Sequence, residues 1–207
     1  FQPRRSLRML PYYRHAERVV DLKPLFETMD LPADIDPGAA AAYGGGRIAL
    51  LSGQLNDAVM AFVSARNRDA RLDCLQFDLG EAYWRDGQFR KGLGLYEAGA
   101  VPTRSMPEQR RQRIALMKRR AGDLEDRTDE ASRLELAAIY RRLGRWPEAV
   151  KIYRSLTEDG QGCADALYHL GVAAELQNRN DEATLYYERA VKALPSHYEA
   201  NLRLQNR

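Results

Sequence analysis

The sequence repeats with a period of 34 residues, and this period constrains the fold more than any other feature. Ala58 and Gly92 lie 34 residues apart, and Ala149 and Ala183 are separated by the same distance. Similar residues recur around each of these four anchors. A fixed period of this length is typical of repeat proteins, in which each structural unit packs mainly on its neighbours.

Each repeat carries the signature of two helices joined by a tight turn. A small residue stands twelve positions before the anchor and an aromatic residue four positions after it, and three repeats have Gly five positions before it. Apolar residues recur at i, i+3, i+4 and i+7, as in amphipathic helices. The Gly permits the left-handed turn that ends the first helix. In chain order, the sets are Gly46, Gly53 and Phe62; Gly80, Gly87 and Tyr96; Ala137, Gly144 and Tyr153; Gly171 and Tyr187.

This pattern resembles the tetratricopeptide-repeat (TPR) family, and the resemblance covers roughly residues 39–106 and 130–207, about seven tenths of the chain. It implies an all-α fold, a TPR-type α-solenoid of antiparallel helix pairs with one odd helix in the middle and helical caps. It also implies a module that binds another protein. The arrangement is similar to TPR segments of bacterial envelope and polysaccharide-machinery proteins.

The period breaks once, and the break defines the expected domains. Gly92 and Ala149 are 57 residues apart, which is eleven short of two periods. We expect a single helix over 107–121 that ends at Gly122. The expected segments are 1–38, a basic segment and helical cap with a Pro-rich linker; 39–106, two repeats; 107–129, an unpaired basic helix and acidic connector; 130–197, two repeats; and 198–207, the start of a capping helix.

Both ends of the repeats are expected to be capped by helices. Between residues 11 and 30, apolar side chains are numerous enough for one or two short helices, interrupted at Pro24, that cap the first repeat; they are Val19, Val20, Leu22, Leu25, Phe26 and Met29. Leu31–Pro37 contains two prolines and is expected to be a linker. At the other end, Tyr198 and Leu202 are expected to pack on the last repeat.

The resemblance also implies a partner-binding groove on the concave face, which the first helix of each pair lines in TPR proteins. Trp, Tyr and Arg are frequent binding hot spots, and a peptide or a helix can lie along such a groove. The alternative is that some of these rings pack against the next repeat. The predicted groove residues are Tyr43, Arg47, Phe77, Glu81, Trp84, Arg141, Tyr168 and Glu175.

A basic cluster in the expected odd helix suggests a second surface. Its members are Arg110, Arg111, Arg113, Arg119 and Arg120. Such a cluster can attract nucleic acid or anionic headgroups. However, no aromatic residue is interleaved for base stacking, and acidic residues follow from Asp123. A solvated helix with internal salt bridges is the alternative.

No arrangement of residues points to catalysis, a metal or a cofactor. The three histidines and two cysteines lack ligand or triad spacing. Gly44–Gly46 has no Lys-Ser/Thr after it, so it does not form a phosphate-binding loop, and we attribute it to close helix packing. We therefore predict a non-enzymatic scaffold or adaptor that binds a peptide or helix of a protein partner in a larger assembly.

Composition leaves the compartment and the oligomeric state open. The chain is 44% hydrophobic and 29% charged, with a net charge of +3. It begins at Phe1, and the basic residues Arg4, Arg5 and Arg8 follow. Such a stretch is typical of the cytoplasmic flank of a membrane helix, of an Arg-rich targeting peptide or of a disordered tail. The first alternative function is thus a soluble recruitment domain attached to a membrane through a segment upstream of Phe1, and the second is a nucleic-acid-binding helical repeat.

Overall fold

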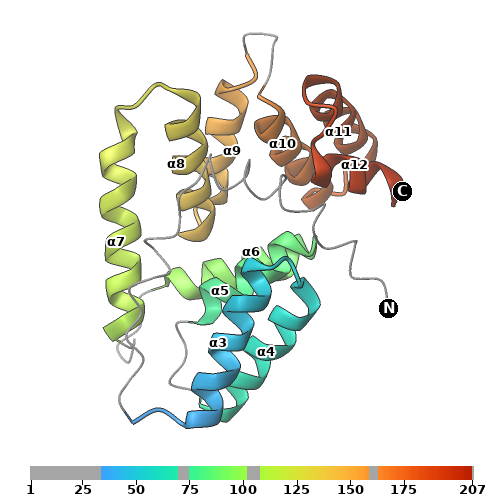
Figure 1. Cartoon of the computed structure of the whole chain (residues 1–207). Coiled ribbons are helices and arrows are strands. Elements are labelled where there is room, and N and C mark those ends of the chain that lie inside the picture. Colours follow the sequence, from blue (N-terminus) through green and yellow to red (C-terminus); the bar gives the residue numbers. More distant parts are fainter. Residues whose placement is uncertain (1–33, 70–74, 102–107, 159–162, 207) are drawn as a thin grey trace. The chain divides into compact units, whose positions relative to one another are not determined.

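The computed structural model describes residues 34–69, 75–101, 108–158 and 163–206 (Figure 1). These ranges contain ten α-helices and no strand, and 81% of their residues are helical. Neighbouring helices contact one another pairwise, so the predicted all-α, TPR-like α-solenoid is confirmed. The expected N-terminal cap between residues 11 and 30 lies outside the described residues. None of the helices described is long and apolar enough to cross a bilayer.

The described residues divide into two compact units. Of the described residues, the first unit contains 34–69, 75–101, 108–120 and 140–146, and the second contains 121–139, 147–158 and 163–206. In the first unit, α3 packs on α4, α4 on α5, and α5 on α6. In the second unit, α10 packs on α11, and α11 on α12. The helices are α3 (Pro37–Leu51), α4 (Leu55–Arg68), α5 (Leu75–Arg85), α6 (Phe89–Ala100), α7 (Glu108–Glu125), α8 (Glu130–Arg142), α9 (Trp146–Ser155), α10 (Ala164–Leu176), α11 (Asn180–Ala193) and α12 (Tyr198–Gln205).

Four similar turns join the helices of the repeats. Gly53, Gly87 and Gly144 adopt the left-handed conformation, with φ of 74°, 79° and 69°. In the fourth repeat, Asn178 takes this conformation with φ of 60°, which Asn tolerates better than most residues with a side chain. In all four turns, the residue after the left-handed one donates its N–H to a carbonyl five residues earlier, as Gln54 does to Ala49 at 2.8 Å. The turn glycines therefore end the first helices, as the sequence predicts.

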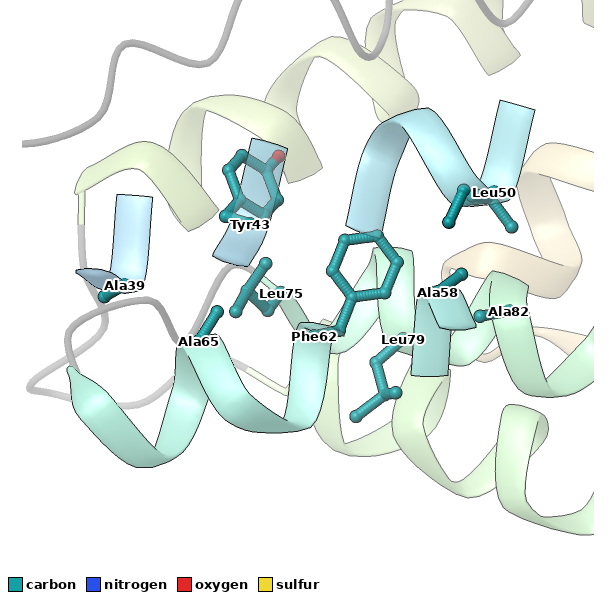
Figure 2. Packing of buried hydrophobic residues seen from close by; sticks show 10 residues of the cluster. Ala39, Tyr43, Leu50, Ala58, Phe62, Ala65, Leu75, Leu79 and Ala82 are labelled. Atoms are coloured by element: carbon teal, nitrogen blue, oxygen red, sulfur yellow. The ribbon is translucent and has the colours of Figure 1, made fainter. Parts of the chain in front are cut away.

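The core of the first unit packs small residues against large ones (Figure 2). The Phe62 ring of α4 lies directly against Gly46 of α3, where an added Cβ would stand 2.7 Å from the ring. The same contact joins Gly80 to Tyr96, at 2.9 Å, and in the second unit Gly171 to Tyr187, at 2.5 Å. In three of the four repeats, the aromatic ring therefore fits against a glycine sixteen residues earlier, on the preceding helix.

Two expectations about these helices were wrong. Close packing explains Gly46 but not Gly44 or Gly45, because a Cβ at either would have no atom within 4 Å. The helix expected to end at Gly122 continues to Glu125 as α7, since a single Gly lowers helix stability without breaking the helix. Tyr198 and Leu202 are 41% and 40% exposed, and the helix that carries them, α12, packs on α11 of the last repeat.

Two glycine replacements in the second unit should have opposite effects. Gly171→Ala would place a methyl group 2.5 Å from the Tyr187 ring, so we expect a loss of about 1–3 kcal/mol in the free energy of unfolding from overpacking. Gly122→Ala adds a methyl group where nothing lies within 4 Å, and we expect a gain of about 0.5–1 kcal/mol from helix propensity. Urea unfolding followed by circular dichroism would measure both. Equal effects would refute the proposed ring contact.

Candidate interaction sites

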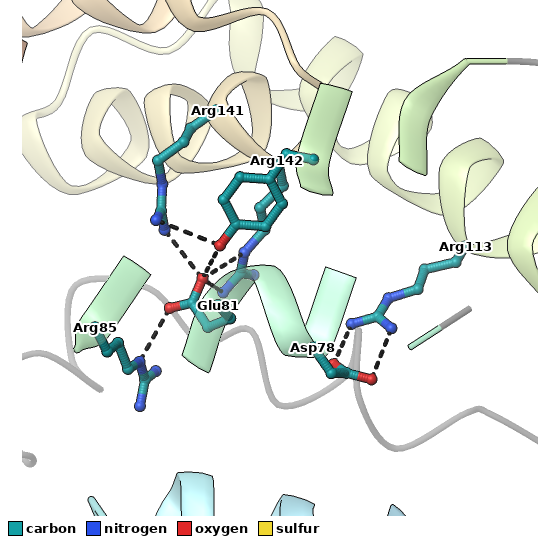
Figure 3. Close-up of polar contacts among 7 residues, drawn as sticks. Asp78, Glu81, Arg85, Arg113, Arg141 and Arg142 are labelled. Carbon is teal, nitrogen blue, oxygen red and sulfur yellow. Dashed lines mark hydrogen bonds and ion pairs between the residues drawn. The ribbon is translucent and has the colours of Figure 1, made fainter. Parts of the chain in front are cut away.

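Two buried carboxylates stand one helical turn apart on α5 in the first unit. Asp78 is the first, and its two oxygens accept hydrogen bonds from the two terminal nitrogens of Arg113 on α7, at 3.0 and 2.7 Å (Figure 3). The hydroxyl of Tyr43 also donates to Asp78, at 3.1 Å. A bidentate Arg–carboxylate pair is strong and directional. It therefore fixes how α7 lies on α5 within this unit.

Glu81 is the second buried carboxylate, and it is surrounded by arginines. Its Oε2 accepts from the hydroxyl of Tyr96 at 2.6 Å and lies 3.2 Å from Arg141 Nη2 and 3.0 Å from Arg142 Nη2. Its Oε1 accepts from Nε of Arg85 at 3.0 Å. Figure 3 shows these side chains converging on the carboxylate. Both carboxylate oxygens of Glu81 thus contact donors within the first unit.

The protonation states in this cluster follow from its charges. Burial by itself would raise the pKa of Glu81, but the arginines Arg142, Arg141 and Arg85 and the Tyr96 hydrogen bond outweigh burial and hold the pKa well below its usual range. Burial, together with the nearby Glu81 carboxylate, raises the pKa of Tyr96 far above its usual value, although Arg141 and Arg142 oppose this. Glu81 is therefore ionised at neutral pH, and Tyr96 is a neutral donor.

An aromatic cluster lies beside these charges in the first unit. The ring of Trp84 lies 5.2 Å from that of Trp146 and 5.0 Å from that of Phe89, measured between ring centroids. The guanidinium carbon of Arg141 stands 4.4 Å from the centroid of the Trp84 ring, within the range of a cation–π contact. Because the chain has only two tryptophans, its tryptophan fluorescence reports on this cluster.

Most of the predicted groove residues of the first unit are buried by contacts within the chain. Tyr43, Phe77, Glu81, Trp84 and Arg141 are all buried, and four of them belong to the networks described above. Phe77 has the guanidinium of Arg113 5.3 Å from its ring centroid. Arg47 is half-buried, with its guanidinium carbon 5.9 Å from the Tyr43 ring centroid. Binding of a partner by these residues stays a prediction.

The basic cluster on α7 has two buried arginines that serve the fold. The Arg110 guanidinium donates to the carbonyl oxygens of Ala98, Gly99 and Val101 at the end of α6, at 2.6, 2.6 and 3.0 Å. This satisfies carbonyls that a helix end leaves without an intrahelical donor. Arg113 pairs with Asp78, as described above. The other predicted members are exposed: Arg111, which pairs with Glu108 at 3.1 Å, Arg119 and Arg120.

In the second unit, one predicted groove residue lines a pocket. The pocket has a volume of about 450 Å³ and is lined by Glu175, Asn180, Thr184, Arg203 and Asn206, which come from α10, α11 and α12. Glu175 Oε2 accepts from the hydroxyl of Tyr187 at 2.8 Å, and Oε1 lies 3.6 Å from Nη1 of Arg203. The pocket therefore offers both charges together with amide and hydroxyl groups.

Tyr168, the other predicted groove residue of this unit, is buried beside the pocket-forming helices. Its ring packs on the rings of His197, at 5.3 Å, and Tyr187, at 5.8 Å. His197 was not predicted to have a role, yet it caps α12: its Nδ1 accepts from the N–H of Ala200 at 3.2 Å, and its Nε2 lies 3.1 Å from Asp165. Tyr168 and His197 thus hold the start of α12 against α10.

The described side chains show no metal-binding cluster, since no three of the His, Cys, Asp and Glu residues in these ranges come together. Cys163 is half-buried, and burial raises the pKa of its thiol to about 12. At neutral pH this thiol stays protonated, and a protonated thiol is a poor nucleophile.

Comparison with known protein families agrees with this geometry. Residues 134–198 match the model of the tetratricopeptide-repeat family. The matched range runs from α8 to the first residue of α12 and covers about a third of the chain. The predicted resemblance to the TPR family is therefore confirmed, and this part of the chain consists of tetratricopeptide repeats, a class of protein-interaction module. No curated protein matches the chain.

Removing the charge of Glu81 should destabilise the first unit strongly. Glu81→Gln leaves Arg141 and Arg142 buried without their carboxylate, and breaking a buried pair in this way costs about 3–5 kcal/mol. Urea unfolding followed by tryptophan fluorescence would measure the change. Glu188→Gln, on an exposed position of α11, is the control and should change stability by less than about 0.5 kcal/mol.

The contribution of Glu81 should disappear in acid. Because the arginines lower the pKa of Glu81 in the folded chain, ionised Glu81 stabilises the fold fully above its unfolded pKa of about 4.3. That contribution is lost as the pH falls through the lower folded pKa. The difference in unfolding free energy between wild type and Glu81→Gln should therefore be constant from about pH 6 to pH 5 and shrink below about pH 4. A difference that stayed constant down to pH 2 would contradict this assignment.

Proposed function

We propose that this chain is a non-enzymatic interaction module that holds a peptide or helix of a partner protein at the pocket of the second unit. One observation carries the proposal: a family of protein-interaction repeats matches residues 134–198, and the pocket lies on the last matched repeat and the helix that follows it. TPR proteins generally bind other proteins and are typically non-catalytic scaffolds.

The pocket suits a polypeptide because its lining can both donate and accept hydrogen bonds. Arg203, Asn180 and Asn206 can donate to carbonyl oxygens, and Glu175 can accept from N–H groups. Glu175 and Arg203 have side chains that are 28% and 23% exposed, so a ligand can reach them. Because Glu175 is acidic and Arg203 is basic, this pair has no net charge. A partner segment with both donors and acceptors therefore fits better than a highly charged one.

The corresponding face of the first unit offers less to a partner. A ligand that bound to α5 would compete with Arg141 and Arg142 for the Glu81 carboxylate. It would also compete with Arg141 for the face of the Trp84 ring. Displacing them would leave charged groups buried without partners, at a cost of several kcal/mol. For this reason we assign the contact surface to the second unit rather than to all of the predicted groove residues.

The two alternative functions differ in what supports them. The basic surface predicted to bind nucleic acid is reduced to Arg111, Arg119 and Arg120. Arg110 and Arg113 instead form hydrogen bonds inside the first unit. Attachment to a membrane protein or to envelope machinery would act through a segment upstream of Phe1. The pocket would then serve as the recruitment site of a larger assembly, so this alternative predicts the same contact surface.

Filling the pocket should abolish partner binding. Thr184→Arg places a long charged side chain in the pocket, whereas Glu188→Arg adds the same side chain one turn further along α11, at an exposed position that does not line the pocket. Each variant is crosslinked in host lysate and purified, and the captured proteins are identified by mass spectrometry. We expect the same partner to be captured by wild type and by Glu188→Arg. The amount of this partner captured by Thr184→Arg should be at least tenfold lower.

Circular dichroism must first show that both variants are folded. If Thr184→Arg captured as much partner as wild type, the pocket would not be the contact surface. Loss of the partner with Arg111→Ala instead would favour the basic face of α7.

A further inference from the structure

The pocket of the second unit places a hydrogen-bond acceptor beside a donor. Glu175 Oε1 on α10 lies 3.6 Å from Nη1 of Arg203 on α12. This distance is longer than the usual hydrogen bond between nitrogen and oxygen. The two side chains are partly exposed, at 28% and 23%. A single ligand group that carries both a donor and an acceptor can therefore contact the two atoms together.

The Glu175 carboxylate is oriented from its other side by Tyr187. Its Oε2 accepts a hydrogen bond from the Tyr187 hydroxyl at 2.8 Å. Burial and the nearby Glu175 carboxylate raise the pKa of Tyr187 well above its usual value, so this hydroxyl keeps its proton and stays a donor. Because Oε2 contacts Tyr187, Oε1 is the oxygen that stands beside Arg203.

The rest of the pocket lining is polar and neutral. The Thr184 hydroxyl donates to the carbonyl oxygen of Asn180 at 3.0 Å, and its own oxygen can act as an acceptor. The side-chain amides of Asn180 and Asn206 complete the lining. These groups suit a ligand that forms hydrogen bonds and carries no full charge.

The charges of the pocket select against ionic and apolar ligand groups. A carboxylate drawn to Arg203 would bring its charge close to that of Glu175, and an ammonium group drawn to Glu175 would approach Arg203. Like charges at such distances repel each other. An apolar group would cover the donor and the acceptor without bonding to them, which is unfavourable. A neutral group with both functions avoids each of these costs.

A primary carboxamide has these functions in the required arrangement. Its C=O and one of its N–H bonds point to the same side, so it can accept from Arg203 and donate to Glu175 Oε1 together. Its second N–H is available to an acceptor such as the Thr184 oxygen. A trans peptide bond directs its C=O and its N–H to opposite sides, so one peptide bond cannot bridge the pair in this way.

We propose that the pocket recognises the side-chain carboxamide of an asparagine or glutamine in the partner segment. Glu175 accepts from the carboxamide N–H, and Arg203 donates to its oxygen. The proposal rests on the proposed function, because it names the side chain that the partner inserts into the same pocket.

Selection of peptides on the full chain tests the proposal. Random peptides displayed on phage are selected on wild type and depleted on Thr184→Arg, once circular dichroism has shown that this variant is folded. Asn206→Arg, at an exposed position of the same lining, replaces it if it does not fold. We expect the remaining peptides to share an asparagine or glutamine. By fluorescence polarisation, one such peptide should bind wild type at least tenfold more tightly than its aspartate or glutamate version.

A change of charge in the pocket should weaken this preference. Glu175→Gln removes the carboxylate charge but keeps an oxygen that can accept from Tyr187. The acidic version of the peptide would then meet Arg203 without an opposing charge, so the tenfold preference should fall below threefold. Glu188→Gln is the matched control, since it makes the same change at an exposed position outside the pocket lining. It should leave the preference unchanged.

The outcomes separate this proposal from the proposed function. Peptides that depend on the pocket but share no asparagine or glutamine would show that it binds the backbone or another group, and would overturn the carboxamide assignment alone. An unchanged preference in Glu175→Gln would do the same. If no selected peptide depended on the pocket, both the assignment and the proposed function would be overturned.

Discussion

Three of the four repeats depend on the contact between a glycine on one helix and an aromatic ring on the next. At Gly46, Gly80 and Gly171, an added Cβ would lie less than 3 Å from the ring of Phe62, Tyr96 or Tyr187. This contact lets the two helices of these three pairs lie close together. Because packed interiors leave little room for adjustment, the small residue and the ring must recur at a constant separation. In these three repeats the glycine and the ring are each time sixteen residues apart.

This dependence explains how much of the fold could be predicted from the sequence. The turns at Gly53, Gly87 and Gly144 and the helix pairs around them follow from local spacing, which a single sequence displays. The continuation of α7 past Gly122 was missed because a Gly signal is ambiguous within a helix.

The candidate sites were less predictable, because their contacts join distant parts of the chain where the period breaks. Asp78 and Arg113 are separated by 35 residues, and Glu81 lies 60 and 61 residues from Arg141 and Arg142. The residue types that mark a binding groove, namely aromatic residues, arginines and carboxylates, also satisfy one another when they are brought together. The sequence placed Glu81 and Arg141 on one face but could not reveal that they pair. At Glu175, the same reasoning selected a residue that lines an open pocket.

Similar residues thus have different surroundings in the two units. In the first unit, the buried charges of α5 hold parts of the same chain. In the second unit, Glu175 and Arg203, 3.6 Å apart, line the pocket that we propose as the partner site. The central claim is that partner recognition belongs to the second unit. Hydrogen–deuterium exchange of the chain, with and without the partner captured from lysate, tests it most directly. The account predicts slower exchange on binding at residues 175–184 and 198–206, and slower exchange in α5 or α7 alone would contradict it.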